Sequence, residues 1–216
     1  MKTSALPALR RALEIRELGT VDYLSALELQ KSALRERAAG ERPDTLFLLE
    51  HPPVYTRGTT ARGQSAPELP HPLHDVQRGG DITYHGPGQL VGYAVVHLKE
   101  RGLTIGRHLR MLEETLVRAL ARMGAEARAL PGFTGVWVGE KKIASIGVGA
   151  RAWVAYHGFA LNVRTEMAPF RAVHPCRLEP ETMTSLHALR PDATMEAARA
   201  AVRAAFCDVY GAGPWS

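Results

Sequence analysis

The stretch "GVWVGEKKIASIGVGARAWVAYHGFALNV", residues 135 to 163, decides the fold of this 216-residue chain. It is rich in valine, isoleucine and aromatic residues, which favour strands, and its glycines mark positions where strands can turn. We expect one hairpin turn at Gly139 and Glu140 and a second near Gly149 and Ala150. The stretch therefore predicts three consecutive antiparallel strands.

Further strands and helices are predicted on both sides of this stretch. Residues 12–18 and 45–50 indicate single strands, and residues 75–98 indicate two or three strands broken by glycine turns. The 3.6-residue apolar period after Thr104 predicts a helix that Gly124 ends. Two more helices are expected, one capped by Thr20 and ending near Ala39 with Leu24, Leu27 and Leu34 on one side, the other from about Met195 to Val209.

These elements do not alternate regularly along the chain. Predicted strands follow one another directly, and helices come between them unevenly. This order favours an α+β class, with a mixed, largely antiparallel sheet flanked by helices, over a doubly wound parallel sheet. The loop of residues 58–76 is longer than the usual connection and is a candidate lid.

The composition limits the class of protein. With 45% hydrophobic residues and no break in composition, residues 1–216 are expected to form a single domain, and we expect a monomer. No apolar run long enough for a membrane span occurs, and the first residues lack a signal-peptide pattern, which predicts a cytoplasmic protein. The net charge of +5 permits an acidic partner. The chain contains no block of arginines that would indicate a nucleic-acid-binding face.

Two cysteines carry different patterns. Cys207 lies in an apolar helical run, which is typical of a packed thiol, whereas Cys176 lies in "AVHPCRLEP", between two prolines and next to charged residues. Without a CxxC motif, neither a disulfide framework nor a zinc site is expected. We favour a nucleophilic role for Cys176 over an inert thiol, with His174, Arg177 or a lysine as the group that stabilises its thiolate.

Lys142 is the candidate partner of that thiol. On a strand, Lys141 and Lys142 point to opposite faces, and Lys142 shares its face with the apolar Ala144, Ile146 and Val148. An inward lysine near a thiol can stabilise the thiolate and exchange protons. The alternative is that Lys142 lies at the strand's edge and reaches to water.

A third candidate is "RGGDITYHGPGQLVGY", residues 78 to 93. Its glycines allow a ligand to lie against bare backbone, with Tyr84 and His85 beside that surface, although a plain glycine-turned hairpin gives the same pattern. Neither the dinucleotide fingerprint nor the P-loop motif occurs, and the nine histidines show no metal-binding spacing. We therefore assign no metal and no phosphate site.

Taken together, six motifs resemble one known family. In order and spacing, the chain is similar to the lipoyl(octanoyl) transferases from about residue 10 to residue 210. The motifs are "EHPPVYTRG" (50–58), "RGGDITYHGPGQLVGY" (78–93), "KIASIG" (142–147), "HGFALNV" (157–163), "PC" (175–176) and "TSL" (184–186). Six motifs in register are far more specific than any one of them.

The resemblance implies the fold of the lipoate and biotin protein ligases and a cytoplasmic acyltransferase without a cofactor. Such an enzyme takes an octanoyl group from octanoyl-acyl carrier protein. It passes the group to a lysine of lipoyl domains, in the E2 subunits of 2-oxoacid dehydrogenases and in glycine cleavage H protein. This is the first step of endogenous lipoate synthesis, and it involves neither nucleic acid nor a membrane.

The resemblance also implies the site. Cys176 corresponds to the thioester-forming nucleophile, and Lys142 to the group that favours its thiolate and handles protons. One departure is that Arg177 follows the cysteine, where the family commonly has glycine, which puts any local oxyanion role in doubt. The acyl chain and its carbonyl are expected to lie along Arg78, Gly79, Gly80, Asp81, Ile82, Thr83, Tyr84, His85, Ser145, Ile146, Gly147, Gly158, Phe159 and Ala160.

Two alternatives stay open at this point. An ATP-dependent lipoate or biotin protein ligase shares the fold and a related lysine but needs no cysteine, so Cys176 favours transfer. A basic nucleic-acid-binding module would need aromatic platforms and clustered arginines, which an aromatic content of 6% disfavours.

Overall fold

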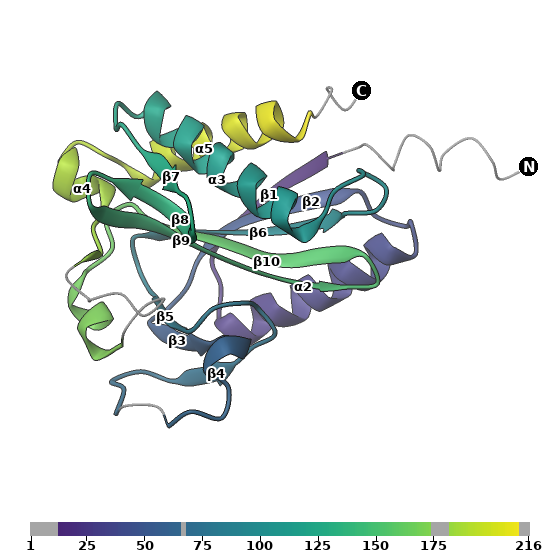
Figure 1. The fold of residues 1–216 in the computed structure, drawn as a ribbon, viewed down its shortest axis with the longest axis horizontal. Coiled ribbons are helices and arrows are strands. Elements are labelled where there is room, and N and C mark those ends of the chain that lie inside the picture. Colours follow the sequence, from purple (N-terminus) through teal and green to yellow (C-terminus); the bar gives the residue numbers. More distant parts are fainter. Residues whose placement is uncertain (1–12, 66–67, 174–181, 212–216) are drawn as a thin grey trace, which may run out of the picture.

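The computed structural model of the protein describes residues 13–65, 68–173 and 182–211. Seven strands form its central sheet: β1 (Leu13–Thr20), β2 (Asp44–Glu50), β6 (Gln89–His97), β7 (Arg128–Leu130), β8 (Phe133–Val138), β9 (Lys141–Arg151) and β10 (Val154–Asn162). Their order is β1-β2-β6-β10-β9-β8-β7 (Figure 1). β1 and β2 are parallel, and the other neighbours are antiparallel. The predicted mixed, largely antiparallel sheet is confirmed.

Helices cover both faces of this sheet (Figure 1). α3 (Ile105–Arg122) and α5 (Met195–Tyr210) lie on one face, α2 (Tyr23–Ala38) lies on the other, and the short α4 (Leu186–Leu189) precedes α5. Leu46 and Leu48 of β2 contribute to the core under α3 and α5, whereas Phe47 and Leu49 contribute to the core under α2. Because β2 is buried on both faces, its sequence is a continuous apolar run.

A second sheet has three strands and lies beside the start of α2 (Figure 1). It contains β3 (Val54–Arg57), β4 (Leu73–Asp75) and β5 (Ile82–His85), with β3 in the middle. The predicted lid segment, residues 58–76, contributes β4 and the 3₁₀ turn Thr59–Ala61 to this part of the molecule. Its role as a lid stays a prediction.

The β8–β9 turn is at Gly139 and Glu140, as predicted, but the β9–β10 turn is not. It lies at Ala152 and Trp153, which have φ angles of 49° and 64°, three residues beyond the predicted position. A two-residue hairpin that matches the strand twist needs left-handed φ at both central residues. Alanine and tryptophan adopt that conformation here, while Gly149 remains inside β9.

The start of α2 was also predicted wrongly. Asp22, not Thr20, caps the helix, because the Asp22 carboxylate accepts a hydrogen bond from Ser25 N at 3.1 Å and Thr20 still belongs to β1. The side chain of Leu24 is 50% exposed, so it is not on the buried side of the helix. The predicted limits of α3 are confirmed, with Thr104 as its N-terminal cap.

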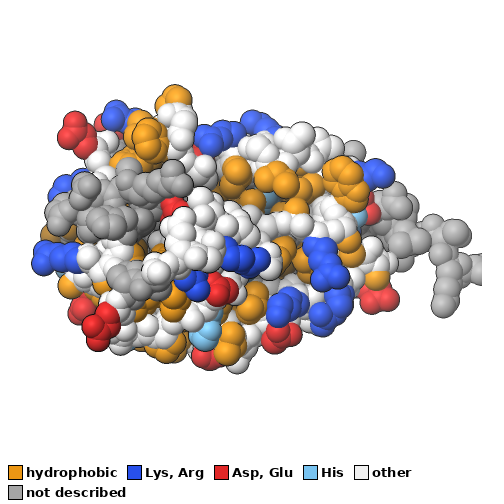
Figure 2. Space-filling view, turned by 60° about the horizontal axis from the view of Figure 1, so that its bottom comes forward, with side chains coloured by type: hydrophobic (Ala, Val, Ile, Leu, Met, Phe, Trp, Pro, Cys, Tyr) orange, Lys and Arg blue, Asp and Glu red, His pale blue; other side chains and the backbone are white. Residues whose placement is uncertain are grey.

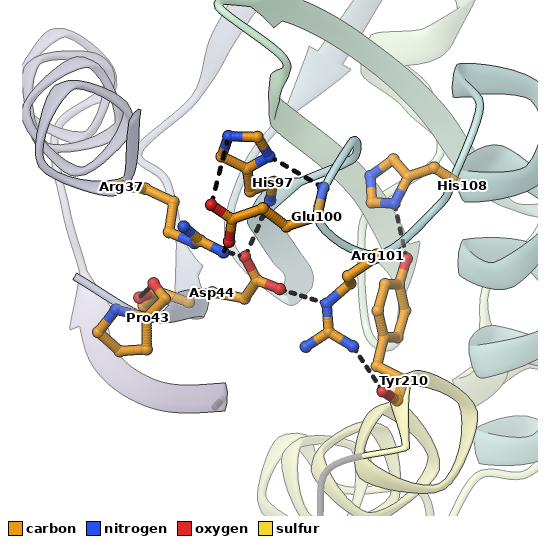
Figure 3. Close-up of polar contacts among 9 residues, drawn as sticks. Arg37, Pro43, Asp44, His97, Glu100, Arg101, His108 and Tyr210 are labelled. Atoms are coloured by element: carbon orange, nitrogen blue, oxygen red, sulfur yellow. Dashed lines mark hydrogen bonds and ion pairs between the residues drawn. The ribbon is translucent and has the colours of Figure 1, made fainter. Parts of the chain in front are cut away.

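A buried ion-pair network fastens the elements at the end of the sheet away from β3–β5 (Figure 3). Asp44 accepts hydrogen bonds from Arg37 Nε at 2.8 Å and from His97 N at 2.9 Å, and it also pairs with Arg101. Arg101 in turn donates to the carbonyl oxygen of Tyr210 at 2.7 Å. One carboxylate therefore connects α2, β2, the turn after β6 and the end of α5.

Candidate active site

A pocket lies between residues 78–85 and the β9–β10 part of the central sheet. Its space free of protein atoms is about 510 Å³, a value that includes the part open to solvent. Its lining residues are Tyr23, Arg78, Gly79, Gly80, Asp81, Ile82, Thr83, His85, Tyr93, Ser145, Ile146, Gly147, His157, Gly158, Phe159 and Ala160.

The segment that covers the pocket rests directly on β9. Gly79 N donates to the carbonyl oxygen of Val148 at 3.0 Å. A Cβ atom at Gly149 would clash with the carbonyl oxygen of Gln77, so only glycine permits this close approach. The glycines of β9 thus serve the covering segment and not the hairpin turn.

Arg78 fixes the same segment to the small sheet. Its Nη2 donates to Thr56 O at 2.7 Å and to Thr56 Oγ1 at 2.8 Å. Thr56 Oγ1 also lies 3.4 Å from His85 Nε2. Burial lowers the pKa of His85 to about 3, and the nearby charges of His51 and Arg78 act in the same direction. His85 is therefore neutral at physiological pH.

The network continues from His85 across the sheet. His85 Nδ1 lies 2.7 Å from Gln89 Oε1, and Gln89 Nε2 donates to Asn162 Oδ1 at 2.9 Å and to Tyr84 O at 3.2 Å. Because the Gln89 nitrogen is already a donor, its oxygen must accept, which places the hydrogen of His85 on Nδ1. Asn162 Nδ2 donates to Thr184 O at 3.0 Å. The pocket is thereby linked to the chain that follows residue 181.

Two tyrosines line the side of the pocket next to α2. Tyr93 donates its hydroxyl hydrogen to His51 Nε2 at 2.7 Å, because His51 Nδ1 donates to Val21 O at 2.7 Å. Burial raises the pKa of Tyr23 to about 12. Both hydroxyls therefore remain protonated, and the pocket meets mostly the rings.

His157 lies beside them and has an unusual backbone. Its φ is +59°, which non-glycine residues rarely adopt, and its N–H donates to Gln30 Oε1 of α2 at 2.9 Å. The side chain is 2% exposed, and among the described residues no hydrogen-bond partner faces Nε2. Burial lowers its pKa to about 3, so the ring is neutral.

Lys142 is buried, as its place on the apolar face of β9 predicted. Only 1% of the residue is exposed, and Nζ donates to the carbonyl oxygen of Thr134 at 2.9 Å. Nζ also lies 5.8 Å from the centroid of the Trp137 ring. The amine is thus held between a carbonyl oxygen and an aromatic face.

Glu113 of α3 supports the part of β8 that contacts Lys142. Its Oε1 accepts a hydrogen bond from Gly135 N at 3.1 Å, and its Oε2 lies 2.6 Å from Arg110 Nη1. Burial raises the pKa of the Glu113 carboxyl, while the bond from Gly135 and the charges of Arg110 and Lys142 act in the opposite direction. The lysine thus lies within the field of a buried carboxyl.

The pocket continues toward Lys142. A second hollow is lined by Lys142 and Thr134 together with Phe133, Ile105 and other apolar side chains. The two hollows share the wall residues Gly79, Gly80, Asp81, Ile146 and Gly147. The pocket and the hollow of Lys142 are therefore neighbours that share part of one wall.

The structure brings together all the predicted substrate-binding residues except Tyr84. The ring of Tyr84 turns away from the pocket and packs against Tyr55 and Phe170. Cys176, and Arg177 after it, lie outside the described residues. Sequence reasoning missed Tyr23, Tyr93 and His157; the last two lie at the ends of quoted motifs, whereas nothing in the sequence singled out Tyr23.

The described residues on both sides of Cys176 are well packed. Val173 joins the apolar cluster around Tyr84. Met183 forms a parallel bridge with Lys142, and Thr184 N donates to Lys142 O at 3.0 Å. The chain therefore lies beside the buried lysine seven residues after Cys176.

Among residues 13–65, 68–173 and 182–211, no group of three His, Cys, Asp or Glu side chains is placed to hold a metal ion. None of the described helices is long and apolar enough to cross a membrane.

Known proteins are similar to this chain in sequence. The family model described as "Lipoyl protein ligase A/B catalytic domain" matches residues 22–207. The octanoyltransferase of Geobacter metallireducens is 49% identical over 175 residues, which are 81% of this chain and 82% of that protein. The octanoyltransferase of Geobacter sulfurreducens is 45% identical over 196 residues, which are 90% of this chain and 83% of that protein.

Solved structures share the fold. A bi-partite lipoate protein ligase from Thermoplasma acidophilum superposes with a TM-score of 0.70 at 17% identity, over 93% of this chain and 83% of that one. Biotin protein ligase from Aquifex aeolicus gives 0.51 at 12% identity, over 93% and 68%. The expected ligase-like fold is confirmed. By the family match and the identities with its relatives, the chain belongs to the octanoyltransferases, which are acyltransferases of the lipoyl protein ligase A/B catalytic domain family.

Proposed function

We propose that this chain transfers an octanoyl group from octanoyl-acyl carrier protein to a lysine of lipoyl domains, through a thioester on Cys176. The observation that carries the proposal is the wall shared by the pocket and the hollow of Lys142. A pocket lined by rings and glycines suits an apolar acyl chain, and the shared wall leads its carbonyl end to a buried amine. The octanoyltransferase relatives support the same acyl group.

The proposed acceptors are the lipoyl domains of 2-oxoacid dehydrogenase E2 subunits and of glycine cleavage H protein. The net charge of +5 supports an acidic carrier protein as the donor, because opposite charge speeds the encounter of two proteins. We propose that the chain acts as a single-domain monomer in the cytoplasm, without a cofactor.

In the first step, the Cys176 thiolate attacks the carbonyl carbon of the donor thioester. A carbon–sulfur bond to Cys176 forms, the bond to the carrier's thiol breaks, and the Lys142 ammonium group protonates the departing thiolate. One thioester replaces another, so little driving force is needed. The oxyanion of the intermediate needs a hydrogen-bond donor, and Ser145 Oγ, buried beside the pocket without a partner among the described residues, suits this role.

In the second step, the amine of the lipoyl-domain lysine attacks the thioester on Cys176. A carbon–nitrogen bond forms, the carbon–sulfur bond breaks, and the neutral Lys142 amine accepts the proton that the incoming amine loses. Lys142 thus returns to its charged form, and Cys176 to the thiolate.

Intact-protein mass spectrometry tests the proposal most directly. The protein is mixed with octanoyl-acyl carrier protein without an acceptor, beside Cys176→Ser and Cys207→Ser. We expect a hydroxylamine-labile gain of one octanoyl group that Cys176→Ser abolishes and Cys207→Ser leaves intact. Cys207 is a suitable control because burial raises the pKa of its thiol, which disfavours the thiolate.

Lys142→Ala is expected to slow both acylation and transfer, each by about 100-fold or more, as for the loss of a general acid–base group. Turnover equal to that of the wild type at every pH would contradict the role of Lys142. No adduct under any condition, with pyrophosphate released from ATP and octanoate, would favour an ATP-dependent ligase.

A further inference from the structure

Two adjacent rings line hollows that Lys142 does not line. The ring of His157 lines the pocket, and the ring of Tyr156 lines a separate hollow on the far side. The two ring centroids are 4.5 Å apart. One ring of this adjacent pair therefore lines each hollow.

The rings of His157 and Tyr156 form a wall, and contacts with neighbouring elements hold this wall in place. The His157 N–H is bonded to Gln30 of α2, and the ring meets Tyr93 edge to face, with centroids 6.2 Å apart. Tyr156 packs against Gly149, where an added Cβ would lie 2.9 Å from its ring. Outside the Ala152–Trp153 turn, His157 is the one described non-glycine residue with positive φ. Such a conformation persists only where the surroundings enforce it.

We infer that the ring of His157 sets the length of the acyl chain that the pocket accepts. This inference rests on the proposed function. His157 lines the pocket but not the hollow of Lys142, so a chain with its carbonyl end near Lys142 that lies along the shared wall directs its methyl end toward His157. A chain with more carbons must displace the His157 ring from its contacts with Tyr93 and Tyr156.

The hollow lined by Tyr156, called the far hollow below, gives a longer acyl chain room once the His157 ring is removed. It lies between α2 and the β9–β10 hairpin, with Leu34, Ala38 and Tyr156 among its lining residues. Three basic residues, Lys31, Arg35 and Arg151, also line it. Figure 2 shows basic side chains gathered on the right of the face that it presents. Removing the His157 ring deepens the pocket toward this space.

His157→Gly tests the inference, because glycine adopts the same φ without strain and leaves no side chain. The kcat/KM values for decanoyl- and octanoyl-acyl carrier protein are compared in the wild type and the variant. We expect the decanoyl-to-octanoyl ratio to rise at least about tenfold, because filling added apolar depth favours each extra methylene. The matched control is Trp153→Gly, which has the same backbone conformation but a side chain that is 60% exposed. Its ratio should equal that of the wild type.

An unchanged ratio in an active His157→Gly enzyme would overturn the inference. Should this variant not fold, His157→Asn is the substitute, because asparagine tolerates left-handed φ and is smaller than histidine. The wild type supplies an independent reading through its Tm with hexanoate, octanoate, decanoate and dodecanoate. We expect the Tm gain to peak at octanoate, and a gain that grows up to dodecanoate contradicts the wall. Failure of the proposed function looks different: the wild type then forms no octanoyl adduct on Cys176.

Discussion

Lys142 is buried at a considerable cost, which its immediate neighbours offset. Desolvating an ammonium group costs several kcal/mol unless hydrogen bonds and opposite charge compensate. Thr134 O supplies a hydrogen bond, the Trp137 ring supplies its face, and Glu113 supplies a nearby carboxyl. These groups orient the amine as well as stabilise it, so under the proposed mechanism the residues that support Lys142 should matter as much as its charge.

Gly135→Ala tests this dependence on position. Gly135 has a φ of +134°, and an added Cβ would lie 2.5 Å from Lys142 Cε and 2.6 Å from Ala144 O. We expect the lysine to be displaced, which should lower transfer by about 100-fold, as for a misplaced catalytic group. Overpacking should also lower the free energy of unfolding by about 1–3 kcal/mol. Steady-state transfer assays and urea unfolding measure the two effects.

Gly139→Ala is the control for this substitution. Gly139 also has a positive φ, of +57°, but it lies in the β8–β9 turn and an added Cβ would contact nothing within 4 Å. We expect only the backbone strain of about 1 kcal/mol and unchanged transfer. If both variants kept full activity, the position of Lys142 would not depend on Gly135.

At the scale of elements, the β9–β10 hairpin has a turn that the sequence does not favour. Ala152 and Trp153 both adopt left-handed φ, where asparagine and glycine are preferred. The double substitution Ala152→Asn, Trp153→Gly should therefore raise the free energy of unfolding by about 1 kcal/mol, measured in urea. Ala150→Gly, at the position where the glycine pattern predicted the turn, should lower it by about 0.5–1 kcal/mol, because Ala150 lies inside β9. Stabilisation by Ala150→Gly together with destabilisation by the double substitution would instead place the turn at Gly149 and Ala150.

The same hairpin shows what the sequence can and cannot predict. Strand composition and alternation were sufficient to identify β8, β9 and β10, but they left Lys142 open between an inward position and the strand's edge, and the structure shows it buried. The role of Gly149 was not predictable, because a glycine that permits a distant segment to approach looks the same as a glycine in a turn. Local pattern indicates that a backbone is unusual there, and only tertiary contacts decide why.

The residues that line the pocket also divide into those that could be expected from the sequence and those that could not. The family resemblance led us to expect the pocket-lining residues of stretches 78–85, 145–147 and 158–160, although Tyr84 turns away from the pocket. Tyr23 was not, because it reaches the pocket through the packing of α2 on the sheet, and His157 was not, because its left-handed φ is a tertiary effect. Cys176 remains a prediction from its motif.

At the scale of the whole molecule, four histidines of the described part of the chain are buried in neutral form. Burial lowers the pKa of His85 and His157 to about 3, lowers that of His108 to about 4, and also lowers that of His51. In the unfolded chain a histidine titrates near 6.5. Below that pH the unfolded state binds more protons than the folded state, so acid favours unfolding.

We expect the free energy of unfolding to fall as the pH drops from about 6.5 to about 4. Each histidine contributes up to about 1.4 kcal/mol per pH unit, so His85, His108 and His157 together give about 4 kcal/mol per pH unit at the steepest part. Urea unfolding at a series of pH values measures this slope. A flat profile between pH 6.5 and pH 4.5 would contradict the buried neutral histidines.

His108→Asn separates the histidines from the carboxylates, which titrate lower. His108 lies far from the pocket, where its Nδ1 is 2.9 Å from the Tyr210 hydroxyl (Figure 3), and the asparagine amide can replace that hydrogen bond. One proton fewer is then taken up when the variant unfolds in acid. The slope of its free energy of unfolding against pH should therefore be smaller by about 1.4 kcal/mol per pH unit, with transfer at pH 7 unchanged. A slope equal to that of the wild type would mean that His108 is already protonated in the fold. Acid sensitivity would then arise only near the pocket, from the residues that hold the proposed acyl site.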